Sequence, residues 1–276
     1  MGWRLSAGIE GPRLGRALGW FSLSWSSGSI LGQGLAGWLS DIHTVLPLAV
    51  SATIYLSAAC LILGAILALP HLADDAPAPE REPAGAVSAP RSLAVAGWVG
   101  AFAVFIALGV FMNVFPIVAK NQLGFSRSLV GVIQLFRVLA YSICLGSFGW
   151  LKFWHYRRQP MTISLALTAM LCAGLIPARS AWQFMALATG LGAIMAFAYS
   201  NSIFHGASSV SGDAARRSWQ MAIHEGVVSG GVIMGSVVGG LIYGSVHAAA
   251  AYAMCAAMAL LGLLARMVII RRGGNF

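Results

Sequence analysis

Long stretches without charged residues constrain this sequence more than any other feature. A helix needs about 20 mostly apolar residues, at about 1.5 Å rise each, to cross the hydrocarbon core of a bilayer. Eight stretches approach or exceed that length, with approximate bounds 17–39, 45–69, 93–118, 129–151, 160–177, 182–204, 219–244 and 247–270. Because a backbone in lipid must satisfy its own hydrogen bonds, we predict that each stretch is a membrane-spanning helix.

The composition argues against a water-soluble domain. Of the 276 residues, 58% are hydrophobic and 9% are charged, whereas a soluble domain is about 25% charged. Such a chain has too few polar residues to cover a core of its own size, and its mean hydropathy is +0.80. We therefore predict an all-α polytopic membrane protein, with the lipid bilayer as its main partner.

The basic residues predict orientation. The net charge is +9, but Lys and Arg form no block and lie beside the ends of apolar stretches, so we predict no nucleic-acid binding. If the first span starts in the cytoplasm, thirteen basic residues fall on that side and only Lys120, Arg127 and Arg179 on the other. The positive-inside rule then predicts a multi-pass protein of the plasma (inner) membrane with both termini in the cytoplasm.

One polar segment divides the chain. Residues 71–91 contain four prolines and six charges, which is typical of a flexible connector without a core. We predict three parts: residues 1–70 with two helices, a cytoplasmic linker at 71–91, and residues 92–276 with six helices.

A glycine pattern occurs twice, 203 residues apart. The first copy has Gly28, Gly32 and Gly37, and the second has Gly231, Gly235, Gly239 and Gly240. Small residues on one helix face let a neighbouring backbone approach closely, so both copies are predicted to be packing motifs. Any two glycine-rich membrane helices align to some extent, but Arg13 and Arg216 keep the same register, which favours a duplication.

These glycines resemble a signature of the major facilitator superfamily of transporters, G-xxx-G-P-xx-G-G in the fifth helix. Gly28, Gly32 and Gly37 match it, while Gln33 and Ala36 depart from it; in the second copy Ser236 replaces the proline. A second family motif, in the loop after helix 8, is retained only at Gly149, Arg157 and Arg158.

The resemblance implies two six-helix halves joined by a cytoplasmic loop, with a substrate cavity between them. Residues 1–70 would then hold helices 5 and 6, as the remnant of an N-terminal half that lacks helices 1 to 4, and residues 92–276 would hold helices 7 to 12. The implied function is secondary active transport of a small solute by alternating access, coupled to protons, with no enzyme activity and no cofactor. The alternative is a truncated, transport-inactive membrane protein with a structural or partner-binding role.

Arg137 lies about halfway along its span. An ionisable group there costs about 2.5–3.5 kcal/mol on insertion scales, so its presence needs a reason. It could bind an anionic substrate or pair with a titrating carboxylate. It could also form a structural ion pair or extend to water in a cavity.

His224 and Glu225 lie near the start of the seventh span. Glu225 could take up and release a proton, with His224 tuning it. Alternatively, Glu225 could form an interfacial ion pair with Arg216 and Arg217 near the positive end of the helix dipole. Direct pairing of Glu225 with Arg137 is not expected, because their depths differ by roughly 10 Å at helical rise.

Uncharged polar residues complete the candidate set. Asn113, Gln134, Asn201 and Trp25 could line a cavity or form hydrogen bonds between helices, and Pro116 could break its helix locally. The four cysteines lie inside apolar stretches without the close spacing of metal ligands, so no metal site is predicted.

Overall fold

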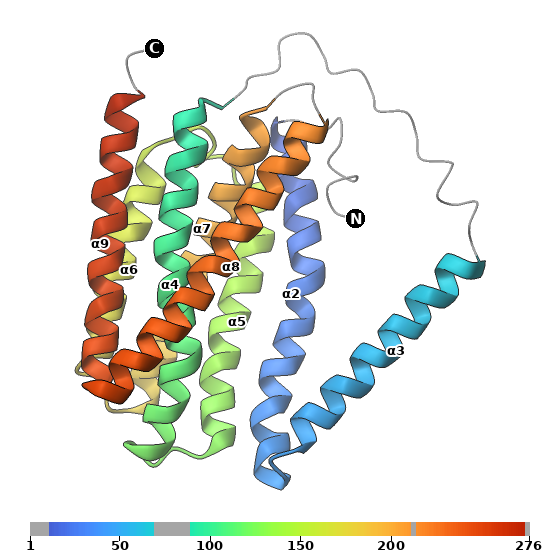
Figure 1. The fold of residues 1–276 in the computed structure, drawn as a ribbon, viewed down its shortest axis with the longest axis vertical. Coiled ribbons are helices and arrows are strands. Elements are labelled where there is room, and N and C mark those ends of the chain that lie inside the picture. The colour runs from blue at the N-terminus through green and yellow to red at the C-terminus, as the bar shows by residue number, and fades with distance from the viewer. Residues whose placement is uncertain (1–10, 69–88, 211–213, 274–276) are drawn as a thin grey trace.

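Helices account for nearly all of the described chain. The computed structural model describes residues 11–68, 89–210 and 214–273, in which helices are joined by short turns (Figure 1). Their bounds are α2 (Gly11–Ile42), α3 (Leu46–Ala68), α4 (Arg91–Asn121), α5 (Arg127–Trp150), α6 (Gln159–Leu175), α7 (Ala181–Ser208), α8 (Ala214–Ser245) and α9 (Ala248–Arg272). Every predicted stretch corresponds to one of these helices, so the all-α fold class is confirmed.

Local signals fix where the helices begin and end. The Ser126 hydroxyl caps α5 by accepting a hydrogen bond from the Leu129 N–H at 3.1 Å. Gly124, with φ of +68°, makes the turn from α4 into α5 in the left-handed conformation that glycine tolerates best. The break expected at Pro116 does not occur, because α4 continues through this residue to Asn121.

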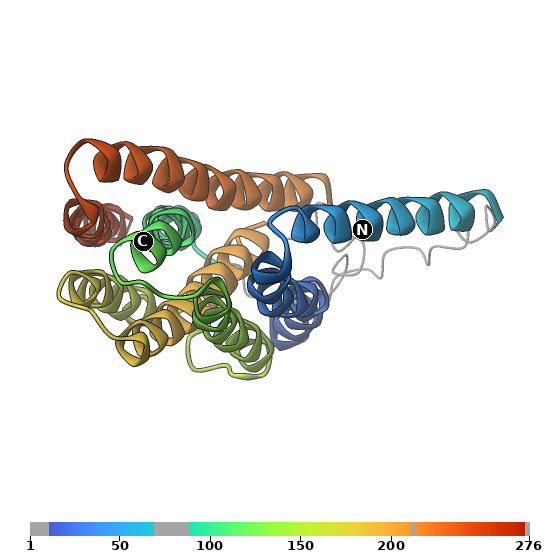
Figure 2. The ribbon, with the colours of Figure 1, turned by 90° about the horizontal axis from the view of Figure 1, so that it is seen from below.

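Successive helices run in opposite directions, and α4 to α9 pack together as one bundle (Figures 1 and 2). The helix α4 contacts α7, α8 and α9. It is the most buried of the apolar helices, because 67% of its 18-residue apolar stretch is buried inside the protein. The helix α2 packs along α5. The helix α3 leans away from the bundle, and none of its 18-residue apolar stretch is buried.

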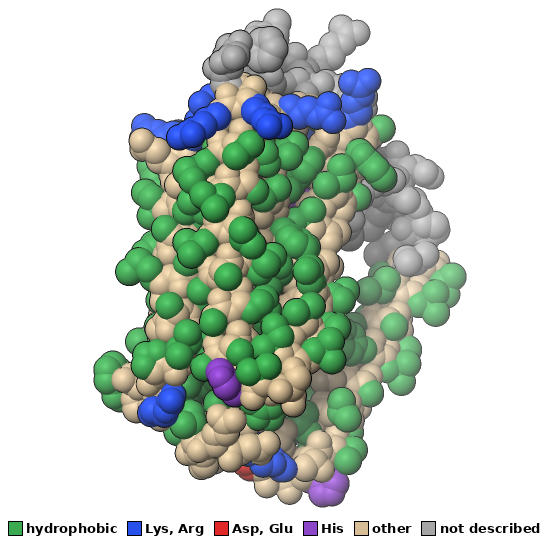
Figure 3. Space-filling view, turned by 60° about the vertical axis from the view of Figure 1, so that its left-hand side comes forward, with side chains coloured by type: hydrophobic (Ala, Val, Ile, Leu, Met, Phe, Trp, Pro, Cys, Tyr) green, Lys and Arg blue, Asp and Glu red, His purple; other side chains and the backbone are tan. Residues whose placement is uncertain are grey.

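The surface between the two ends of the bundle is apolar (Figure 3). Six described helices, namely α3, α4, α5, α7, α8 and α9, are long and apolar enough to cross a membrane. The helix α6, with 17 residues, is shorter than a typical span. The molecule is a polytopic helical membrane protein.

Basic residues gather at one end of the bundle (Figure 3). We call this the basic end; it includes Arg91 where α4 starts, Arg216 in the first turn of α8, and Arg271 where α9 finishes. The opposite end includes Lys120, Arg127 and Arg179. Residues 71–88, most of the predicted linker at 71–91, lie outside the described residues.

The second glycine motif lies where α8 crosses α4. A Cβ atom added at Gly235 would lie 2.1 Å from the Ile106 carbonyl oxygen, and one added at Gly231 would lie 2.8 Å from that of Phe102. At Gly239 the nearest atom would be a methyl group of Val110 at 2.6 Å, whereas Gly240 has nothing within 4 Å. Three of these four glycines therefore bring the two backbones together.

The first glycine motif makes a single close contact. A Cβ atom at Gly37 would lie 2.6 Å from the Arg127 carbonyl oxygen, where α2 meets α5. At Gly28 and Gly32 it would meet no atom of the described residues within 4 Å. The two copies thus differ in how many of their positions pack against another helix.

Candidate functional site

Close helix contacts bring polar faces of α5, α7 and α8 together. A Cβ atom at Gly192 of α7 would lie 2.1 Å from the Arg137 carbonyl oxygen, so α5 and α7 touch at the level of this arginine. The glycines of α8 hold that helix against α4, which also packs on α7. Side chains from all three helices can therefore meet beside the core.

Arg137 is buried in α5, with 5% of its surface exposed. Its Nε donates a hydrogen bond to the Oε1 atom of Gln134, 2.9 Å away and one turn earlier. One turn later on the same helix, the Tyr141 ring is close enough to interact electrostatically with the guanidinium. The sequence predicted Arg137 and Gln134 as separate candidates, and the structure joins them.

Glu225 belongs to the same group of residues. The Tyr199 hydroxyl of α7 donates a hydrogen bond of 2.8 Å to the Glu225 carboxylate. Tyr141 lies within electrostatic range of both Glu225 and Tyr199. No salt bridge joins Arg137 to Glu225 among the described residues, but Tyr141 lies within electrostatic range of both side chains.

His224 adjoins the carboxylate on its buried side. Its Nδ1 atom lies 2.9 Å from the Ser202 hydroxyl, and its Nε2 atom lies 3.9 Å from the Glu225 carboxylate. Its ring packs edge-on against Tyr199 at 4.6 Å between centroids. The Glu225 side chain itself is 55% exposed.

These contacts define one cluster, which we call the polar network. Its members are Gln134, Arg137, Tyr141, Tyr199, Ser202, His224 and Glu225. Charged residues stand at its two sides, and the tyrosine hydroxyls between them can both donate and accept hydrogen bonds. The arrangement can hold a carboxylate in its charged form and respond when that carboxylate is protonated.

Three members, Tyr141, Tyr199 and Ser202, were not among the predicted residues. Tyr141 follows Arg137 by four residues, the spacing that places two side chains on one helix face. Tyr199 and Ser202 lie inside the predicted span 182–204, where a polar side chain needs a hydrogen-bond partner. Those two signals were present in the sequence, but the pairing of Tyr199 with Glu225 depends on how α7 and α8 pack.

The remaining predicted residues lie elsewhere. Asn113 of α4 donates hydrogen bonds to the Ser236 hydroxyl at 2.7 Å and the Gly109 carbonyl at 2.9 Å, which links α4 to α8. Asn201 is fully buried, and no hydrogen-bond partner for its side-chain amide is found in the described part of the chain. The Trp25 side chain falls outside the described residues. No group of three or more metal-ligating side chains is found within the described ranges.

A pocket of about 370 Å³ leads to the polar network from the opposite end of the bundle. It lies between α2, α4 and α5, and Lys120 and Arg127 line it together with Gln33 and Gln134. Because Gln134 bonds Arg137 and also lines this pocket, a small solute bound there would contact the network directly.

Comparison with known proteins adds no relative to this picture. None of the protein-family models matches the chain, and none of the curated proteins does either. The argument for function therefore rests on the helices and the polar network that they assemble.

Proposed function

We propose that the protein is a secondary active transporter that moves a small solute by alternating access and is coupled to protons at Glu225. One observation carries this proposal: the Glu225 carboxylate, in a helix long and apolar enough to cross a membrane, accepts a hydrogen bond from Tyr199. Tyr141 lies within electrostatic range of this carboxylate and of the buried Arg137. Ionisable groups within membrane helices are costly and are usually retained for ion or substrate pathways.

The geometry suggests how protonation would act. A carboxylate accepts a stronger hydrogen bond than a neutral carboxylic acid, so protonation of Glu225 would weaken the bond from Tyr199. Arg137 would then lose the nearby negative charge. Both changes alter how firmly α8 is held to α7 and α5, which is the kind of bias that shifts a protein between two conformations.

The pocket beside Gln134 is the proposed solute site. Lys120 and Arg127 line it, whereas none of its lining residues is acidic, so it favours small solutes that carry negative charge. The resemblance to the major facilitator superfamily supports the same mechanism. With the basic end in the cytoplasm, as the positive-inside rule favours, the pocket would lie on the outer side.

A reconstitution experiment tests the coupling. Purified protein in liposomes, with a pH-sensitive dye trapped inside, is exposed to pools of small organic and inorganic anions. We expect solute-dependent proton movement that Glu225→Gln abolishes, because the amide cannot take up a proton. Asp74→Asn is the control, since Asp74 belongs to the predicted linker and lies outside every predicted span. Proton movement that survives Glu225→Gln would remove Glu225 from the coupling role.

A second candidate, a structural or partner-binding membrane protein, is favoured by a different observation. None of the 18-residue apolar stretch of α3 is buried. Glu225 is half exposed on α8, which is apolar enough to cross a membrane. Surfaces of this kind suit contact with further helices. If no pool drives proton movement and the protein instead purifies with a fixed membrane partner, this second function is preferred.

A further inference from the structure

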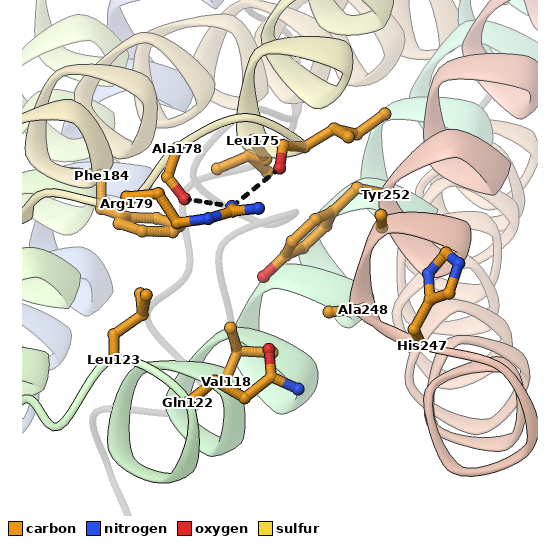
Figure 4. Close-up of a pocket in the computed structure, with 12 residues that line it drawn as sticks. Val118, Gln122, Leu123, Leu175, Ala178, Arg179, Phe184, His247, Ala248 and Tyr252 are labelled. Carbon is orange, nitrogen blue, oxygen red and sulfur yellow. Dashed lines mark hydrogen bonds between the residues drawn. The ribbon is translucent and has the colours of Figure 1, made fainter.

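A second pocket lies at the end of the bundle opposite the basic end, separate from the polar network. It has a volume of about 360 Å³ and is enclosed by α4, α7, α9 and the turn after α6 (Figure 4). Val118, Leu123, Leu175 and Phe184 form apolar walls, and Gln122, Arg179, His247 and Tyr252 supply polar groups. Nothing in the proposed transport mechanism uses this pocket.

Tyr252 of α9 gives the clearest sign that something occupies the pocket. Only 2% of this residue is exposed, and no hydrogen-bond partner for its hydroxyl is found among the described residues. In Figure 4 the hydroxyl points into the space between Arg179, Leu123 and Gln122. A buried hydroxyl without a partner costs about 1–3 kcal/mol, so native proteins usually satisfy it with water or a ligand.

Arg179 supplies positive charge beside that hydroxyl. Its Nη1 atom donates to the carbonyl oxygens of Ile176 at 3.0 Å and Ala178 at 2.8 Å, which fixes the guanidinium at the pocket wall (Figure 4). These bonds use only Nη1 of the guanidinium, and within the described chain Nε and Nη2 make no hydrogen bond and can donate to a ligand. A planar guanidinium with two such donors suits the oxygens of phosphate or carboxylate.

The other polar groups of the pocket can also donate hydrogen bonds to an anion. His247 accepts a hydrogen bond from the Ala250 N–H at its Nδ1 atom, so its remaining ring nitrogen, Nε2, carries the proton and is a donor. Gln122 can donate through its amide, and none of the lining residues is acidic. The pocket therefore combines donors and one fixed cation with apolar walls.

We propose that this pocket binds a phosphate group, with Arg179 pairing with its charge and Tyr252 donating a hydrogen bond to one of its oxygens. The apolar walls would accommodate the carbon chain next to such a group. The phosphate could belong to a phospholipid headgroup or be free in solution, and the chemistry of recognition is the same.

Two probes distinguish these sources. In the first, inorganic phosphate is titrated into the full-length protein in a detergent without phosphate, and the thermal unfolding midpoint is followed, because a ligand that binds only the folded state raises it. In the second, the protein is placed in nanodiscs of phosphatidylcholine that contain a minority of phosphatidylglycerol. It is then released from the nanodiscs, and the lipid that stays bound to it is identified by native mass spectrometry.

Arg179→Gln and Tyr252→Phe remove the two proposed contacts. We expect about tenfold weaker binding or more for Arg179→Gln and severalfold weaker binding for Tyr252→Phe, since a hydrogen bond to a charged group is among the stronger ones. Arg157→Gln and Tyr55→Phe are the matched controls; they make the same chemical changes at exposed residues outside the pocket and should leave binding unchanged.

Each outcome decides the proposal. Phosphate protection that both pocket variants weaken supports a free anion, and phosphatidylglycerol retention that both weaken supports a lipid headgroup. If neither probe binds, or if both bind the pocket variants as well as the controls, water alone fills the pocket and the proposal is wrong. Glu225→Gln does not touch this pocket, so failure of the transport proposal would leave these results unaffected.

Discussion

Arg137 is buried in α5 with an amide and a tyrosine as its nearest polar neighbours, and no carboxylate contacts it directly within the described chain. Burying a cation without such a partner is unfavourable, because the lost hydration is only partly replaced. A residue kept under those conditions is more simply explained by function than by stability. If Arg137 instead had a structural role, removing it would destabilise the folded protein.

We expect Arg137→Met to stabilise the folded protein while abolishing solute-driven proton movement. Methionine fills a similar volume without the desolvation penalty, and replacing a buried charge with a packed apolar side chain has been worth about 1–4 kcal/mol in comparable cases. Thermal unfolding in detergent measures the first effect, and the liposome assay measures the second.

Arg127→Met is the control for the stability effect alone, because Arg127 also lines the proposed solute pocket. The Arg127 guanidinium donates to the Ser40 carbonyl oxygen at 2.7 Å and so ties α5 to α2. Its loss should reduce stability by about 1 kcal/mol, as for an ordinary hydrogen bond. A lower unfolding temperature for Arg137→Met would instead show that Arg137 is a structural residue.

At the scale of elements, the glycines of α8 determine where the polar network lies. The contact of Gly235 with Ile106 sets the separation of α8 from α4, and Glu225 is carried on the same helix ten residues earlier. A side chain at Gly235 would push the two backbones apart and tilt α8. The same substitution at Gly240, where nothing lies within 4 Å, should be accommodated without movement.

Gly235→Ala should therefore lower the free energy of unfolding by about 1–3 kcal/mol, the usual effect of overpacking a close contact. Gly240→Ala, in the same helix, should be neutral or stabilise by up to about 1 kcal/mol, because alanine favours helix. Thermal unfolding of the two variants side by side is the measurement. Equal stabilities would mean that α4 and α8 do not approach each other as closely as described.

The helices themselves were predictable from sequence, because uncharged stretches of this length have one stable form in lipid. Their ends were less accurate: α4 and α7 extend beyond the apolar stretches at 93–118 and 182–204, since helical hydrogen bonding continues into the interface. The polar network was predicted only in part. Arg137 and Glu225 form no salt bridge among the described residues, in agreement with their predicted difference in depth. The hydrogen bond from Tyr199 to Glu225 depends on how α7 packs against α8, which spacing along a single helix does not determine.

For the whole molecule, the segregation of basic residues to one end is the strongest constraint on orientation (Figure 3). Successive helices alternate in direction, so two residues lie at the same end of the bundle only if an even number of helices crosses between them. Arg91, Arg157 and Arg271 do so in the structure, whereas Lys120 and Arg179 reach the other end. A wrong number of crossings would have scattered these residues over both ends.

Cysteine labelling in intact cells tests this arrangement. In a variant whose four native cysteines, Cys60, Cys144, Cys172 and Cys255, are replaced by alanine, we expect Lys120→Cys to react with a membrane-impermeant maleimide added outside. We expect Arg157→Cys to react only after the membrane is permeabilised, because the positive-inside rule predicts that the basic end faces the cytoplasm. Placing one cysteine at residue 80, in the linker, extends the test: it must behave like Arg157→Cys, since an even number of crossings separates the two positions. External labelling at residue 80 but not at Arg157→Cys would mean that one of the helices between them does not cross, and the six-helix half, with the proposed outward pocket beside Gln134, would have to be redrawn.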